Sequence, residues 1–156
     1  MKSLLAVLAM TTALTAPAVA SARQVTFTAR VASYYGPPAY LAFYVTDAQG
    51  KYAGSLWMAG TRTRYYRHLR DWYRDTGGDT SQIAGLTGAS VGPGGGVRFT
   101  LNLSDSAFDA GYVLHIDGAV ENYYESPNDL SVPLTTGNAG KTEQGRNLVS
   151  SFSYTM

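Results

Sequence analysis

The chain of 156 residues contains no cysteine, only two histidines, and few charged residues, which make up 15% of the sequence. The absence of cysteine excludes disulfides, iron–sulfur clusters, thiolate zinc sites and cysteine nucleophiles. Twelve basic and 11 acidic side chains give a formal net charge of +1. Nucleic-acid-binding proteins usually carry a basic excess, so this balance argues against that class. The length and the hydrophobic fraction of 45% fit an ordinary globular domain.

A secretory signal peptide is predicted for residues 1–20. Its parts are a basic start, a short apolar run and a small-x-small cleavage site, supplied by Lys2, residues 4–14 and Ala18-Val19-Ala20. The apolar run is too short to cross a bilayer, which takes about 20 residues. Cleavage after Ala20, or after Ala22 in a second register, leaves one mature domain, residues 21–156 in the first case. We expect that domain in the periplasm, not embedded in the membrane, with a net charge of zero once Lys2 is removed.

Hydrophobic patterns predict a mainly β domain. Alternating or aromatic-rich strands are expected at residues 24–31, 39–47, 51–59, 97–103, 111–120 and 147–155, with a short edge strand at 131–134 that tolerates Pro133. A helical stripe predicts one short helix over residues 64–75, capped by Thr61 or Thr63 and ended by Gly77-Gly78. The fold class that follows is an antiparallel, immunoglobulin-like β-sandwich of six to seven strands with one inserted helix.

Aromatic side chains gather where the third strand leads into this helix. The densest group is Trp57, Tyr65, Tyr66 and Trp72. Such residues suit strands and sheet rims, but they also form stacking surfaces for a planar ligand such as an isoalloxazine or a sugar ring. Both interpretations stay open from the sequence.

The predicted helix and the residue pair before it hold a cluster of arginines. Its arginines are Arg62, Arg64, Arg67, Arg70 and Arg74, which face Asp71 and Asp75. They form either a solvated face with an Arg67–Asp71 pair or a patch for an anion or a partner. His68 with Asp71 is a candidate general-acid pair. His115 is expected on an ordinary surface, and the two histidines, far apart and without a third ligand of matching spacing, predict no metal site.

A glycine-rich segment over residues 81–96 is predicted to be a loop. Glycines allow the backbone to adopt positive φ and to approach a bulky group closely. The hydroxyls of Thr87 and Ser90 stand within this stretch. The segment either carries a modification site or only connects the helix to the next strand.

Four segments resemble, in order, a family of predicted periplasmic proteins called domain of unknown function 2271. They read YLAFYVTDAQGKYAGSLWMAG, RYYRHLRDWYR, GLTGAS and GYVLHIDGAVEN. The resemblance covers nearly all of the mature chain and implies a periplasmic protein. It implies no established enzymatic activity.

Thr87-Gly88-Ala89-Ser90 also resembles the acceptor motif of periplasmic flavin transferases, Asp-x-x-[Ser/Thr]-Gly-Ala-[Thr/Ser]. Those magnesium-dependent enzymes use FAD and join FMN through a phosphoester to the last hydroxyl of the motif. The resemblance implies that Ser90 carries covalent FMN and that a membrane-anchored PepSY-type protein is the redox partner. The sequence departs from the motif at Ala84, where the motif has Asp.

Three hypotheses follow from the sequence. The first is a flavinylated electron carrier, in which Trp57, Tyr65, Tyr66 or Trp72 shields the flavin and the arginines balance its phosphate. The second is a non-catalytic periplasmic binding or interaction module without cofactor, which Ala84 favours. The third is a hydrolase-like enzyme that uses His68 and Asp71. A carrier or binding module fits the sequence better than an enzyme with its own active site.

Overall fold

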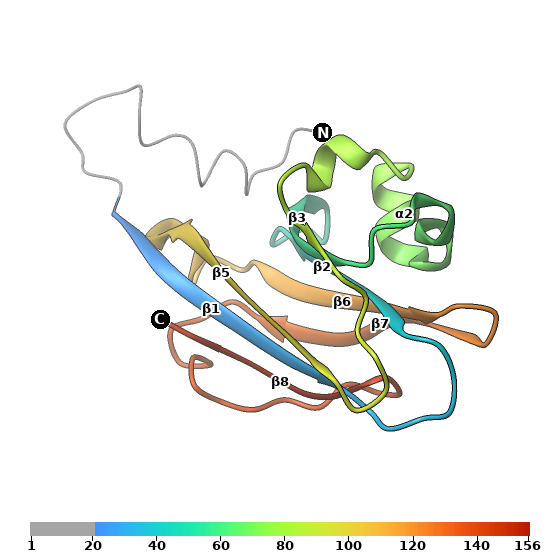
Figure 1. Cartoon of the computed structure of the whole chain (residues 1–156). Helices are drawn as coiled ribbons and strands as arrows, with labels where there is room; N and C mark the ends of the chain where they lie inside the picture. The colour runs from blue at the N-terminus through green and yellow to red at the C-terminus, as the bar shows by residue number, and fades with distance from the viewer. Residues whose placement is uncertain (1–20) are drawn as a thin grey trace.

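Two β-sheets packed face to face form the body of the protein (Figure 1). A helical segment, residues 63–76, covers the outer side of the larger sheet. The structure is a computed structural model that describes residues 21–156. The predicted signal peptide, residues 1–20, lies outside the described residues. The expected β-sandwich class is confirmed, with eight strands, one of which has only two residues.

The smaller sheet has three antiparallel strands in the order β5-β1-β8. Their bounds are Ala22–Val31 for β1, Gly96–Ser104 for β5 and Val149–Thr155 for β8. In β1 the alternate residues Val25, Phe27 and Ala29 are buried, because one face of the sheet packs on the core and the other faces solvent. The short 3₁₀ helix η4, Asp105–Ala107, follows β5.

The larger sheet has the order β4-β3-β2-β6-β7. Its strands are β2 (Ala39–Thr46), β3 (Tyr52–Ala59), β4 (Thr87–Gly88), β6 (Val113–Val120) and β7 (Tyr124–Pro133). All pairs are antiparallel except β3 with β4, which run parallel. Every residue of β2 is buried, because this central strand has the sandwich core on one face and the helical segment on the other.

Two hydrophobic cores lie on opposite faces of the larger sheet. The main core fills the space between the sheets and includes Phe27, Phe43 and Phe152. The second core lies between the sheet and the helical segment and is built on Tyr40, Tyr44, Tyr66, Leu69 and Trp72. The helical segment is thus fixed to the sheet by buried aromatic and aliphatic side chains, as its short length requires.

The predicted single helix at 64–75 is wrong in one respect, since the structure divides it. A 3₁₀ helix η2, Thr63–His68, is followed by α2, Arg70–Thr76, and Leu69 between them has φ −85° and ψ 78°. At the N-terminus of each helix, the N-cap residue makes no side-chain hydrogen bond to the helix, so the expected threonine cap is absent. Gly77 ends α2 with φ 64°, the left-handed conformation that glycine adopts without strain.

Two further segments differ from the sequence expectation. The edge strand predicted at 131–134 is the end of β7, which begins seven residues earlier, at Tyr124. Its polar stretch from Glu125 to Asp129 hides the strand pattern in the sequence. The glycine-rich segment 81–96 is not all loop, because it overlaps the 3₁₀ helix η3, Thr80–Ile83, and contains β4.

Candidate functional site

The segment that resembles the FMN-acceptor motif lies at an edge of the larger sheet. The two residues of β4 pair with the end of β3, through bonds from Met58 N to Leu86 O (2.7 Å) and from Gly60 N to Gly88 O (2.8 Å). Three residues after Gly88, Val91 forms an antiparallel bridge with Ala39. These anchors use backbone groups, so holding the segment in place requires neither of its hydroxyls.

The side chains of this segment are accessible to different degrees. Thr87 and Ala89 are exposed, and Gly88 and Ser90 are half-buried. Because β4 is an edge strand, its outer side has no neighbouring strand in the sheet. The predicted acceptor Ser90 therefore stands on a surface segment that is fixed at both ends.

Gly88 of the motif packs directly on Trp57. A Cβ atom on Gly88 would lie 2.8 Å from Cζ2 of the indole, which is too close for any other residue without a shift. Trp57 itself points toward the main core and stacks on Phe99, with ring centroids 5.2 Å apart. Its Nε1 is the one buried side-chain N or O atom without a hydrogen-bond partner among residues 21–156. An unsatisfied indole donor thus lies directly behind the motif.

The other three aromatic residues predicted for the site lie on the opposite face of the sheet from Trp57. Trp72 is fully buried and donates from Nε1 to Ser55 Oγ (2.9 Å). Tyr66 is buried beside it and donates its hydroxyl to Gly60 O (2.9 Å). Both side chains therefore serve the packing of the helical segment. Tyr65 is half-buried and still presents part of its ring to solvent.

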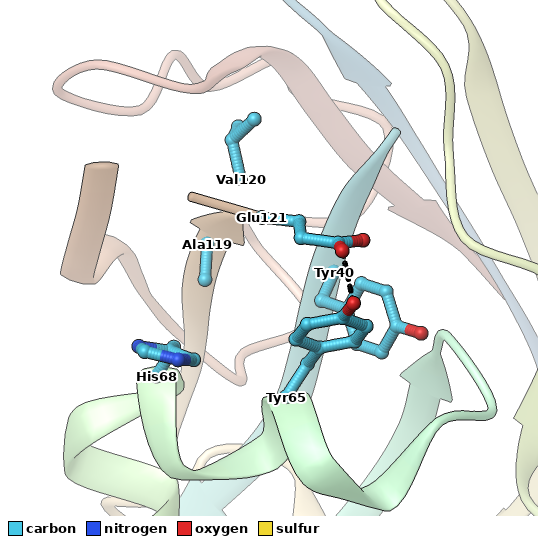
Figure 2. A pocket seen from close by; sticks show the side chains of 6 residues that line it. All are labelled: Tyr40, Tyr65, His68, Ala119, Val120 and Glu121. Carbon is cyan, nitrogen blue, oxygen red and sulfur yellow. Dashed lines mark hydrogen bonds between the residues drawn. The ribbon is translucent and has the colours of Figure 1, made fainter. Parts of the chain in front are cut away.

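Tyr65 borders a small pocket at one end of the helical segment. The pocket lies between η2 and the ends of β2 and β6, and its lining residues are Tyr40, Tyr65, His68, Ala119, Val120 and Glu121. Figure 2 shows the Tyr65 ring beside Tyr40, with its hydroxyl directed to the Glu121 carboxylate, to which it donates a hydrogen bond. The two tyrosine rings meet edge to face at 5.4 Å. The chain thus places aromatic rings and a carboxylate around one small cavity.

The charged residues of the helical segment pair differently from the sequence expectation. Arg74 bonds to Asp71 (2.8 Å) and to Asp75 (3.0 Å), so the expected Arg67–Asp71 pair is wrong. Arg70 pairs with Glu125 of β7. Three exposed arginines in and just before the helical segment, Arg62, Arg64 and Arg67, do not take part in the ion pairs found within residues 21–156.

His68 has Glu125, not Asp71, as its partner. Its Nδ1 lies 2.6 Å from Glu125 Oε1 of β7, and the helix is interrupted at Leu69, between His68 and Asp71. Burial acts to raise the pKa of Glu125, but hydrogen bonds from Arg70 and His68 outweigh burial and hold it below its ordinary value. The His68–Asp71 pair, on which the hydrolase hypothesis rests, is therefore not formed.

Asp117 of β6 is a buried residue whose role the sequence did not reveal. Its side chain has no exposed surface and accepts hydrogen bonds from Trp72 N (2.7 Å), Asn128 N (2.8 Å) and the Tyr44 hydroxyl (3.3 Å). Burial raises the pKa of this carboxyl above its ordinary value. Asp117 satisfies a backbone donor in the first turn of α2, where the local sequence offers no cap.

His115 lies on the same face and is part of a polar network. Its ring stacks on Tyr44 at 5.2 Å, Nε2 lies 2.8 Å from Thr46 Oγ1, and Nδ1 lies 2.8 Å from Asn128 Oδ1. The expectation of an ordinary surface histidine is wrong for this half-buried ring. A histidine and an aspartate on alternate positions of a buried strand were the signal available in the sequence.

Residues 21–156 contain no cluster of three or more histidine, aspartate or glutamate side chains placed to hold a metal ion. Within these residues, no helix combines the length and the apolar character that crossing a membrane requires.

The fold and site define a β-sandwich protein with a glycine-rich motif on a sheet edge. The model of a family described as predicted periplasmic protein (DUF2271) matches residues 22–151, and the chain belongs to this family. No curated protein and no solved structure matches the chain.

Proposed function

We propose that this protein is an exported electron carrier with FMN joined to Ser90 through a phosphoester. The observation that carries the proposal is the position of Thr87-Gly88-Ala89-Ser90 on an exposed sheet edge, where backbone hydrogen bonds hold the segment without using its hydroxyls. A modifying enzyme can reach such a segment without unfolding the sandwich. A rigid scaffold that presents a functional loop is a common arrangement in proteins.

The residues around the motif fit an attached FMN in part. Trp57 provides an unsatisfied buried donor next to Gly88. The motif aspartate is replaced by Ala84, which is exposed after η3. Asp79 does not take its place, because its carboxylate already accepts a bond from Ser81 N (2.9 Å). The transferase must therefore bind this acceptor without a carboxylate at position 84.

The attachment is a phosphoryl-type transfer without net oxidation or reduction. The Ser90 oxygen forms a bond to the FMN phosphorus of FAD, the bond from that phosphorus to the AMP oxygen breaks, and the hydroxyl proton leaves with AMP or solvent. Once attached, FMN supplies the electron transfer, and the protein holds and orients it. The proposed partners are a flavin transferase and a membrane-anchored PepSY-type redox protein.

Co-expression with a flavin transferase tests the proposal. Intact mass should rise by one FMN less one water, and the band should fluoresce in a denaturing gel. Ser90→Ala should abolish the gain, whereas Thr87→Ala, a matched loss of a hydroxyl three residues away, should keep at least part of it. Ala84→Asp should increase the fraction modified. No gain for wild type or Ala84→Asp, while a control acceptor is modified, would refute the proposal.

The second candidate is a binding module without cofactor, which one observation favours. Tyr35 is 95% exposed and Tyr123 is 58% exposed, and the ring of Tyr123 lies beside Gly36 at the same end of the sandwich. Exposed aromatic side chains on short loops are typical of protein interaction surfaces. Unmodified protein that captures a periplasmic partner, and loses it in Tyr35→Ala, would support this candidate.

A further inference from the structure

β5 forms one edge of the smaller sheet, and within residues 21–156 it pairs only with β1 (Figure 1). At one end of this pairing, Val31 N donates to Gly95 O (2.9 Å). At the other end, Asp105 N donates to Ser21 O (2.9 Å). Opposite residues of antiparallel strands alternate between pairs that exchange hydrogen bonds and pairs that do not. The odd-numbered residues of β5 therefore bond to β1, and the even-numbered residues direct their N–H and C=O groups outward.

A side-chain contact supports this direction of the peptide groups. Thr26 of β1 lies opposite Thr100 of β5, and their hydroxyl oxygens are 2.9 Å apart. Opposite side chains come closest in pairs that exchange no backbone hydrogen bonds, so the N–H and C=O of Thr100 point away from β1. No loop or second strand of residues 21–156 bonds to the backbone of Arg98, Thr100 or Asn102, and all three residues are exposed. β5 thus presents a row of unpaired backbone donors and acceptors.

The core-facing side of this edge is only partly covered. Phe99 and Leu103 of β5 are buried, whereas Val97 and Leu101, on the same face of the strand, are half-buried. Trp57, which stacks on Phe99, is half-buried as well. A strand added next to β5 would satisfy the outward backbone groups and cover more of Val97 and Leu101.

The edges formed by β7 and β8 differ from β5 in this respect. Natural edge strands usually carry features that prevent pairing with another chain, such as prolines, charges or a covering loop. β7 contains two prolines, and Arg146 N bonds to Asp129 O (2.7 Å). β8 is bridged by Glu143. β5 has nine residues, no proline, no register shift against β1, and Arg98 as its one charged residue.

We infer that two copies of this protein pair through β5, antiparallel and centred on Thr100, so that their smaller sheets form one continuous sheet. In this register all nine residues of the strand overlap, and outward-directed residues face each other, as an antiparallel ladder requires. Thr100 lies opposite Thr100 of the second copy, and Arg98 lies opposite Asn102, so no like charges meet. The strand is therefore complementary to itself, as a two-fold interface requires. The inference goes beyond the proposed function and does not depend on Ser90.

Sedimentation equilibrium and amide exchange of the exported protein, made without a flavin transferase, test this pairing. We expect a dimer whose fraction rises with protein concentration. Protection of the Thr100 amide should rise with it, whereas the Phe99 amide, bonded to β1, should be protected at every concentration. Thr100→Pro removes the outward N–H and no bond to β1, and it should raise the dimer dissociation constant about tenfold, since each copy loses one hydrogen bond. Thr100→Ala, which keeps the N–H, is the matched control and should still form the dimer.

Charge changes at Asn102 test the register and decide the question if Thr100→Pro does not fold. Asn102→Asp places a carboxylate opposite Arg98 of the second copy and should tighten the dimer a few-fold, and Asn102→Lys should weaken it by a similar factor. High salt should reduce both effects. Purified protein that stays monomeric at its highest soluble concentration, or a dimer with a freely exchanging Thr100 amide, would overturn the inference. A dimer that responds equally to Asn102→Asp and Asn102→Lys would overturn it as well.

Discussion

Asp117 connects the larger sheet to α2, and its removal should weaken the helical segment first. In Asp117→Asn one acceptor oxygen remains, and the new amide N–H₂ faces a backbone donor, either Trp72 N or Asn128 N. A buried donor left without an acceptor costs about 1–3 kcal/mol, and a bond to a charged group adds about 1.5–3 kcal/mol. The neutral asparagine carries no buried charge, and this offsets part of the free-energy cost. We expect a net loss of about 2–4 kcal/mol in the free energy of unfolding.

Urea unfolding and amide exchange measure the effect. The midpoint of unfolding should fall with an unchanged slope, and protection of the Trp72 amide should fall by more than that of the β1 amides. Glu143→Gln, a matched change at an exposed carboxylate, should leave the midpoint in place. A midpoint within about 0.5 kcal/mol of wild type, with the Trp72 amide still protected, would refute the assigned role of Asp117.

Two further predictions test packing and charge. Gly88→Ala should destabilise the fold by about 1–3 kcal/mol, because its Cβ would meet the Trp57 indole, whereas Gly92→Ala, with no atom within 4 Å of its Cβ, should not; thermal unfolding checks both. Glu125→Gln should lower the free energy of unfolding at pH 7. The difference from wild type should shrink as pH falls below about 4 and through the folded pKa, because the folded pKa of Glu125 lies below its unfolded value and the stabilisation is complete only above the unfolded pKa.

The strands could be predicted where one physical pattern dominates. The alternation around Val25 and Phe27 indicates a strand with one solvent-exposed face. The aromatic run of β2 indicates a strand that is covered on both faces. β7 was found only at its end, because its buried Ser126 and Asp129 are satisfied by hydrogen bonds and not by apolar burial. Sequence patterns do not report such bonds between distant residues.

The helix and its charges show the same limit. The apolar stripe located the helical segment correctly, but not the break at Leu69. The groups that bind this segment to the sheet are distant in sequence: Asp117, 45 positions after Trp72, accepts a hydrogen bond from Trp72 N, and Glu125 pairs with His68. Local spacing therefore gave the wrong ion pairs.

The candidate site was predictable as a motif but not as an arrangement. Thr87 and Ser90 were identified from their neighbours in the sequence, whereas the pocket depends on the register that sets Tyr40 beside Ser90. Trp57 and Trp72 are close in sequence to the same junction, yet they lie on opposite faces of the sheet. Sheet register and side-chain direction decide which aromatic residues surround a site.

The most direct test of the proposed function locates the modified atom. After co-expression with a flavin transferase, trypsin cleavage after Arg74 and Arg98 releases one peptide, residues 75–98, that contains both Thr87 and Ser90. Tandem mass spectrometry of this peptide should place the whole mass of FMN less water on Ser90. An unmodified peptide under conditions that load a control acceptor, or FMN located on Thr87, would contradict the account.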